Sequence, residues 1–99
     1  MLNSEISSLN NRSAQGRLSS TETVSLSYPV NIDGLEVSSL MMRRPLVRDR
    51  LIAEKASGSE TEKEIRLIAN LCDMAPQHIE LLDLADYNKL QECLAGFLS

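Results

Sequence analysis

Apolar and polar residues divide this chain into two regions that meet near Thr23. Residues 1–22 hold six Ser and three Asn, and apart from Met1 they contain five apolar side chains, at positions 2, 6, 9, 14 and 18. Such a segment buries too little apolar surface to offset the roughly 1 to 2 kcal/mol of backbone ordering that each residue costs. We therefore predict that residues 1–22 form a disordered tail and that residues 23–99 form one domain.

After Thr23 the pattern alternates with a period of two, which is typical of a β-strand with one apolar face. Val24, Leu26 and Tyr28 fall on that face. The dipeptide Asp33-Gly34 follows, and it supplies the positive backbone angles of a type I′ hairpin turn. The sequence thus predicts a β-hairpin.

The returning strand is predicted over residues 35–42, with Leu35 and Val37 on one face and Leu40 on the other. A two-stranded hairpin is only marginally stable in water. Helices must therefore cover its apolar face.

Two helices are predicted in the middle of the chain. Pro45 favours a helix start, so residues 46–55 form the first, and Ser59 with Glu62 has the spacing of a capping box that begins a second at about Glu60. The second helix carries an apolar stripe with the spacing i, i+3, i+4 and i+7, namely Ile65, Ile68, Ala69 and Cys72.

The last third of the chain predicts two more helices. Pro76 opens a short one that reaches Leu82, and Asp83 is the N-cap of the final one, with Asp86 near its positive end. The apolar face of the final helix consists of Tyr87, Leu90, Leu94 and Phe97. The fold class is therefore α+β, an N-terminal β-hairpin followed by three or four short helices, and mostly helical.

The amino-acid composition argues against two classes of function, nucleic-acid binding and membrane association. Ten basic and fourteen acidic residues give a net charge of −4, which is the wrong sign for a domain that coats nucleic acid or anionic lipid. No apolar run approaches the roughly 18 residues of a membrane span. We expect a soluble, intracellular protein that contacts neither membrane nor nucleic acid.

Motifs for catalysis are missing. The chain has one histidine, His78, no phosphate-binding loop and no hydrolase or metalloprotease motif. Cys72 and Cys93 lie in separate apolar segments and are interpreted as free thiols. We therefore predict no catalytic, cofactor or metal site, and no enzyme.

One local feature suggests a binding surface. Four arginines within eight residues follow a methionine pair, and methionine side chains adapt to varied partners. The predicted partner-binding residues are Met41, Met42, Arg43, Arg44, Arg48 and Arg50. One alternative is that the methionines fill the core at the strand end. Another is that the arginines pair internally with acidic groups, since residues 54–99 carry nine acidic and four basic side chains, or that they contact an acidic protein partner.

A helix-turn-helix outline also exists, with residues 65–72, a break, and residues 76–82. Its reading helix would present Gln77, His78 and Glu80 and no Arg or Lys. Binding to phosphates and reading guanine both call for cations. Ordinary helix packing explains this outline better than DNA binding.

The order of motifs resembles the small tail assembly chaperones of contractile-tailed bacteriophages. The resemblance is carried by residues 24–29, 32–34, 43–45, 64–65, 68–72, 82–83 and 86–87, with Val37, Leu40, Asp49, Ile79 and Phe97. Residues 1–22 extend beyond the usual start of such proteins. No role of the tail is therefore implied.

The resemblance implies a non-enzymatic role in the host bacterial cytoplasm during virion morphogenesis. Such chaperones bind the long, helical tape measure protein and keep it soluble until tail-tube protein polymerises around it. A longer, frameshifted form of the same chain is often made. The other hypotheses are a small DNA-binding regulator of helix-turn-helix type and a structural subunit of a phage tail. Because so small a domain buries a limited share of its surface, we also expect a homo-oligomer.

Overall fold

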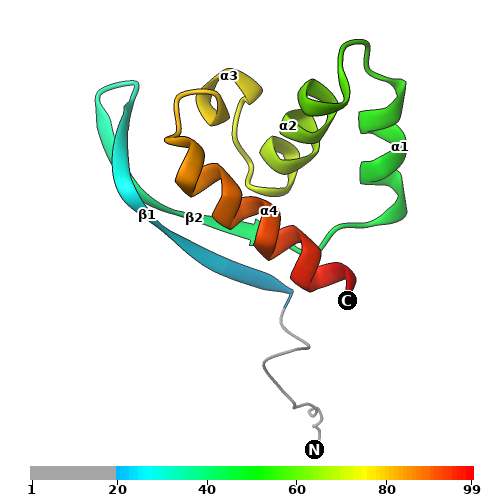
Figure 1. Cartoon of the computed structure of the whole chain (residues 1–99), viewed down its shortest axis with the longest axis horizontal. Coiled ribbons are helices and arrows are strands. Elements are labelled where there is room, and N and C mark those ends of the chain that lie inside the picture. The colour runs from blue at the N-terminus through cyan, green and yellow to red at the C-terminus, as the bar shows by residue number, and fades with distance from the viewer. Residues whose placement is uncertain (1–19) are drawn as a thin grey trace, which may run out of the picture.

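The computed structural model describes residues 20–99, in which two strands precede four helices (Figure 1). The elements are β1 (Thr21–Ile32), β2 (Leu35–Arg43), α1 (Val47–Lys55), α2 (Glu60–Leu71), α3 (Pro76–Ile79) and α4 (Leu84–Leu98). The predicted α+β fold is confirmed. The tail prediction falls almost wholly on residues outside the described range and stays a prediction. Order is seen from slightly before the predicted boundary, because β1 begins at Thr21 and the Ser20 carbonyl accepts a hydrogen bond of 2.8 Å from the Arg44 amide.

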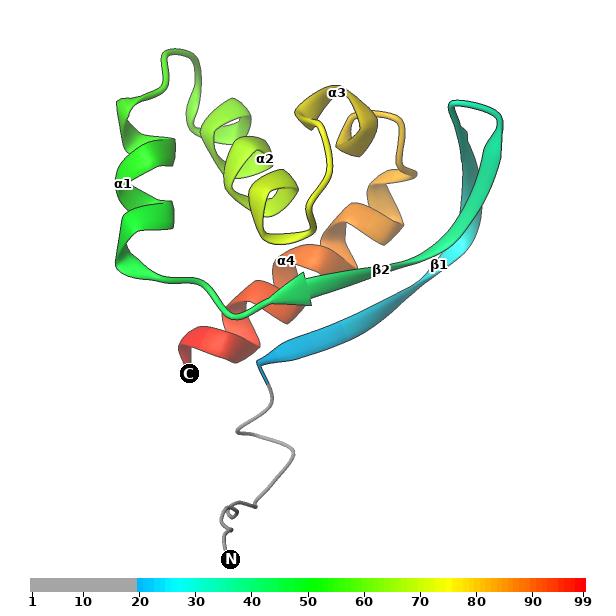
Figure 2. The same cartoon turned by 180° about the vertical axis from the view of Figure 1, so that it is seen from behind.

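The hairpin and α4 lie side by side, and α2 and α3 pack against them (Figures 1 and 2). The core forms where these elements meet, from the side chains of Val24, Leu40, Met42, Ile68, Ala69, Leu71, Cys72, Ile79, Tyr87, Leu90, Leu94 and Phe97. Helix α1 stands at the edge of this arrangement and packs on α2. The two ends of the molecule are therefore α1 and the hairpin turn.

The hairpin turn agrees with the prediction. Asp33 and Gly34 have backbone φ angles of 53° and 87°, as a type I′ turn requires. The strands pair in register next to the turn and again from Ser25 and Ser39 onward, but the register shifts between Ser25 and Val30.

That shift corrects the prediction for Tyr28, whose side chain is 58% exposed while Val24 and Leu26 are buried. The carboxylate of Asp86, itself fully buried, accepts hydrogen bonds from the consecutive amides of Ser27 at 2.8 Å and Tyr28 at 3.0 Å. Consecutive amides of a regular strand point to opposite edges. The strand therefore loses its alternation here, and Tyr28 turns outward.

The returning strand differs from its prediction for the same reason. Its buried residues are Leu40 and Met42, Val37 is half-buried, and Leu35, beside the turn, is exposed. The core-facing residues thus lie mainly at the end of β2 that joins α1, where α2 and α4 cover the sheet.

Local capping signals place the two longer helices. Ser59 and Glu62 form the predicted capping box, with hydrogen bonds of 2.8 and 3.1 Å. The Asp83 carboxylate accepts a hydrogen bond of 2.8 Å from the Ala85 amide at the start of α4. The predicted apolar face of α4 is buried throughout.

The third helix is shorter than predicted. Helix α3 ends at Ile79 instead of reaching Leu82. The amides of Leu81 and Leu82 bond to carbonyls three residues back, at 3.1 Å each, so the chain tightens into a turn that leads to the Asp83 cap. A single helical turn with buried Ile79 is too short to serve as a DNA-reading helix.

Candidate protein-binding groove

The six residues predicted to bind a partner do not gather on one surface. Met42 is fully buried, so the core-filling alternative applies to it, while Met41 is 58% exposed. Met41 pairs with Thr23 across the hairpin.

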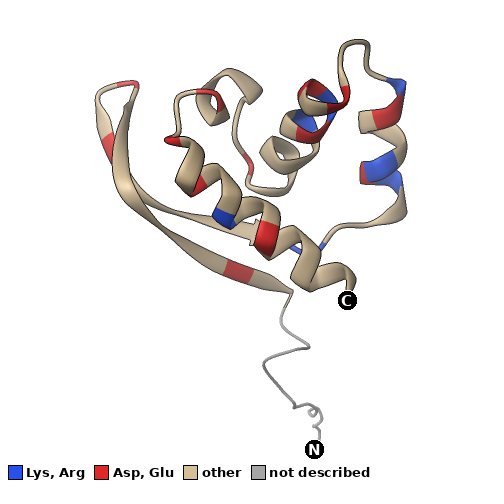
Figure 3. Ribbon diagram, in the orientation of Figure 1, with Lys and Arg blue, Asp and Glu red and all other residues tan. Residues whose placement is uncertain are grey.

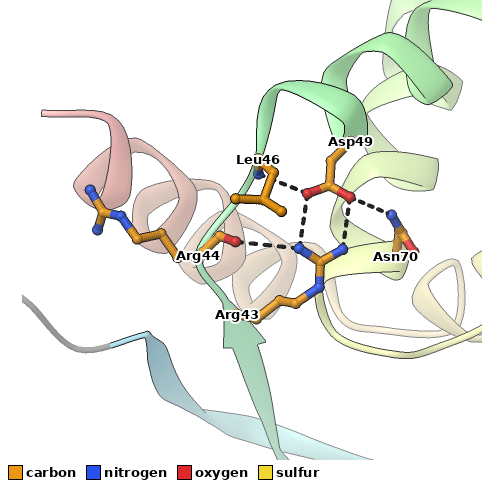
Figure 4. Close-up of polar contacts among 5 residues, drawn as sticks. All are labelled: Arg43, Arg44, Leu46, Asp49 and Asn70. Atoms are coloured by element: carbon orange, nitrogen blue, oxygen red, sulfur yellow. Dashed lines mark hydrogen bonds and ion pairs between the residues drawn. The ribbon is translucent and has the colours of Figure 1, made fainter.

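Arg43, whose side chain is partly exposed, forms an ion pair with the buried Asp49 (Figure 4). Its Nη1 and Nη2 donate to the two carboxylate oxygens of Asp49 at 2.9 and 2.7 Å. The same carboxylate accepts from the Leu46 amide at 2.8 Å and from Asn70 Nδ2 at 2.9 Å. This set of contacts, the Asp49 cluster, joins the end of β2, the start of α1 and the middle of α2.

The contacts of the Asp49 cluster favour the ionised form of the Asp49 carboxylate. Asp49 is 3% exposed, and the hydrogen bonds from Arg43 outweigh its desolvation, so its pKa falls to about 2. Arg43 thus has an internal ion-pair partner, but that partner is Asp49 and not an acidic group of residues 54–99.

Arg44 also has an internal partner. Its guanidinium lies 5.5 Å from the centroid of the Phe97 ring, and Nη2 donates to the Phe97 carbonyl at 3.2 Å. A cation near the last carbonyls of a helix interacts favourably with the helix dipole. Arg44 therefore attaches the end of β2 to the end of α4.

Helix α1 presents three different faces, because successive residues turn by about 100° around a helix. The buried face carries Asp49 and Ala53 and packs on α2. A second face carries Leu46 and Val47 with Arg50. The third face carries Arg48 with the exposed residues Leu51 and Ile52.

The second face of α1 forms one wall of an apolar groove. One cleft of about 310 Å³ is lined by Pro45, Leu46, Val47, Arg50, Leu67, Leu94 and Leu98. An adjoining cleft of about 470 Å³ shares Arg50, Leu67, Leu94 and Leu98 and continues to Glu54, Glu60, Lys63, Glu64 and Gln91. Together they form a groove between α1 and the last turns of α4, with α2 as its floor, which we call the α1–α4 groove.

The α1–α4 groove exposes apolar side chains that the core does not use. Val47 is 87% exposed, Leu98 62% and Leu46 50%. Single exposed apolar residues are common, but several around one groove mark an interaction site. Of the predicted binding residues, Arg50 alone lies in it.

Sequence reasoning missed this groove, although a signal was present. The apolar residues of α1 form two adjacent pairs, 46–47 and 51–52, instead of one stripe. Such a helix cannot bury all of them against one neighbour. The surplus apolar residues were therefore available to a partner.

The remaining side chains offer little chemistry for catalysis. Burial raises the pKa of Cys72 to about 11, and that of the half-buried Cys93 is also raised, so neither is an activated thiol. Within residues 20–99, no three His, Cys, Asp or Glu side chains are placed to hold a metal ion. In the same range, every helix is too short or too polar to cross a membrane.

Comparison with known proteins identifies the family. Residues 23–99 match the protein-family model described as phage tail assembly chaperone proteins, E, or 41 or 14. The chain belongs to this family of phage tail assembly chaperones. No curated protein and no solved structure matches it.

Membership places the chaperone among proteins that act in bacteriophage tail assembly by interaction with tail proteins. The features of this chaperone that suit such a role are the exposed apolar residues around the α1–α4 groove and Arg50, which lines it.

Proposed function

We propose that this chaperone binds helical segments of the tape measure protein in the α1–α4 groove and keeps that protein soluble in the host cytoplasm until tail-tube subunits enclose it. The observation that carries the proposal is the apolar groove itself, bordered by helices on both sides. Grooves of this kind accept the apolar face of an amphipathic helix. A long helical client would otherwise aggregate through its exposed apolar stripes.

The position of Arg50 supports the same proposal. Arg50 lines both clefts of the groove, beside its apolar residues. Cations beside an apolar contact steer acidic segments of a partner and raise the association rate. Binding should therefore weaken as salt rises without disappearing, because the apolar contact remains.

Co-expression with the tape measure protein of the same genome tests the proposal. Soluble client should be recovered only when this chaperone is present. Val47→Glu and Leu98→Lys, tested singly, should each reduce the recovered client. Both changes suit the helix dipole, since Val47 begins α1 and Leu98 ends α4, so the fold should survive.

Met41→Glu is the matched comparison, because Met41 is exposed on the hairpin and does not line the groove. Client recovery should be unchanged in this variant. If Met41→Glu abolishes recovery while Val47→Glu and Leu98→Lys do not, the client binds the strand end, as the sequence suggested, and the groove proposal is wrong. If the client stays equally soluble without the chaperone, neither the groove nor the strand end is its binding site.

We also propose that the chaperone self-associates. Its third α1 face, with Leu51 and Ile52, and the opposite end of the molecule, with Leu81 and Leu84, both expose apolar side chains. Neither patch belongs to the α1–α4 groove. Assembly between copies would therefore leave the client site open.

A further inference from the structure

The charges of the α1–α4 groove are unevenly distributed along its length. In the cleft around Pro45 and Leu46, Arg50 is the one charged lining residue. The adjoining cleft shares Arg50 and also contains Lys63, but three carboxylates, Glu54, Glu60 and Glu64, outnumber these two cations. The groove is thus positive at the start of α1 and negative at the start of α2.

The internal contacts of these residues do not remove the asymmetry. Lys63 lies 3.9 Å from both Glu54 and Glu60, at the limit of an ion pair, and the side chain of Glu60 remains 88% exposed. Glu64 accepts hydrogen bonds from Tyr87 at 2.6 Å and Gln91 at 2.8 Å, which leaves its charge in place. No described residue forms an ion pair with Arg50.

We propose that the α1–α4 groove fixes the direction of the helix that it binds through this charge asymmetry. The occupant is an amphipathic helix with an apolar stripe, an acidic side chain opposite Arg50 and a basic side chain opposite Glu54 and Glu60. A segment whose sequence runs from acid to base lies parallel to α1. A segment that runs from base to acid lies antiparallel.

The dimensions suit a helix of about three turns. Nine residues of α1 span about 14 Å at 1.5 Å per residue. Apolar side chains at i, i+4 and i+7 of the occupant would face the apolar lining, which includes Leu46, Leu67 and Leu98. The apolar contact provides the affinity, and the charges at the two ends select the orientation.

This inference rests on the proposed helix-binding role of the groove but not on the identity of the client. The probes are two synthetic peptides of 16 residues with blocked termini and the same composition. Both carry leucines at i, i+4 and i+7. One has glutamates in its first turn and lysines in its last, and the other has these exchanged. A photo-crosslinking group at each N-terminus reports which end of the groove it occupies.

With the full-length chain, the acid-first peptide should crosslink near Leu46 and Val47, and the base-first peptide near Glu60 and Lys63. We expect each preference to be about fivefold, because two exposed charge pairs change sign when a helix reverses. Crosslinking of both peptides to the same end, or outside the groove, overturns the inference.

The double variant Arg50→Glu plus Glu54→Lys supplies the decisive comparison. It makes the Arg50 position negative and cancels the excess negative charge at the other end, where Glu60 and Glu64 then face Lys63 and the introduced lysine. It also keeps a favourable i, i+4 pair on α1, so the helix should not be weakened. The preference of each peptide should invert. Arg48→Glu, on the third face of α1, is the matched control and should leave both preferences unchanged.

The peptide experiment can fail or succeed independently of the proposal that the tape measure protein is the client. If the peptides bind with opposite directions but the tape measure protein is soluble without the chaperone, the groove is directional and its client is a different helical protein. If the double variant leaves the preferences as they were, the charge asymmetry does not set direction, whatever the client.

Discussion

Asp49 connects three elements through one buried carboxylate. It accepts four hydrogen bonds, two from Arg43 and one each from Leu46 and Asn70. Replacement of one partner leaves a desolvated charge without compensation, which is costlier than the net value of the pair. The geometry of α1, and hence of the groove wall, therefore depends on this residue.

Arg43→Ala should lower the free energy of unfolding by about 3 kcal/mol, because Asp49 then stays buried with half of its hydrogen bonds. Arg43→Lys should recover part of this loss, since an ammonium cannot reproduce the two parallel bonds of a guanidinium. Urea denaturation measures both. Arg48→Ala is the control and should stay within about 0.5 kcal/mol of the parent. Equal stability of Arg43→Ala and Arg48→Ala would contradict the role assigned to the Asp49 cluster.

The lowered pKa of the Asp49 carboxylate should make the free energy of unfolding sensitive to acid. The pKa of Asp49 is lowered from 3.8 to about 2, first by the Arg43 hydrogen bonds. A folded-state pKa below the unfolded value stabilises the fold above the unfolded pKa, and the contribution is lost as pH falls through 4 toward 2. The difference corresponds to about 2 kcal/mol. The stability gap between the parent and Asp49→Asn should therefore close between pH 5 and pH 2 in thermal melts.

At the scale of elements, the shape of the hairpin depends on one interaction that is local in sequence and one with a distant residue. The local signal is Asp33-Gly34, which sets the turn. The distant signal is Asp86, which occupies the amides of Ser27 and Tyr28 from a helix nearly sixty residues later. Burial alone would raise the pKa of Asp86, but hydrogen bonds from β1 and Lys89 lower it.

Gly34→Val should destabilise the fold by about 1 to 3 kcal/mol, the range for a strained backbone position. The strain comes from the φ angle of +87°, since no heavy atom lies within 4 Å of the added Cβ. Gly96→Ala is a matched control, because Gly96 lies in α4 and its Cβ would also meet open space. That variant should be neutral or stabilising by up to about 1 kcal/mol. Melting temperatures of the two variants that shift equally would refute the turn assignment.

These elements also show what the sequence is able to predict. The turn, the Ser59 capping box and the Asp83 cap follow from neighbouring residues, so a short window of sequence contains the whole interaction. The outward turn of Tyr28 depends on Asp86, and the burial of the Asp49 carboxylate depends on Arg43 and Asn70. The α1–α4 groove needs residues from three helices, so composition alone could only suggest that α1 has surplus apolar residues.

At the scale of the whole molecule, the two ends of the longest axis differ in their charged residues, and both ends expose apolar side chains. Helix α1 carries Arg48, Arg50 and Lys55 beside two acidic residues, Asp49 and Glu54, whereas the hairpin turn and the α3–α4 connection carry the acidic residues Asp33, Glu36, Glu80 and Asp83 (Figure 3). Each end exposes leucines beside these charges. Opposite charges next to apolar patches at the two ends favour contact between the α1 end of one copy and the hairpin end of the next.

Such head-to-tail association uses two different surfaces, so it continues into a ring or filament unless one surface is blocked. Sedimentation of the parent chain at high micromolar concentration should show species larger than a dimer, and added salt should reduce them.

Leu51→Glu blocks the third face of α1, and Leu84→Glu blocks the start of α4; both side chains are exposed, so the fold should tolerate the changes. Each variant alone should be a monomer, because every copy lacks one of the two surfaces. An equimolar mixture should form heterodimers and nothing larger, since one intact α1 face then meets one intact hairpin end. A two-fold symmetric dimer would behave differently, because it pairs a surface with itself and one of the two variants would still dimerise alone. Sedimentation of the mixture beyond the dimer, or a monomeric parent chain, contradicts head-to-tail assembly.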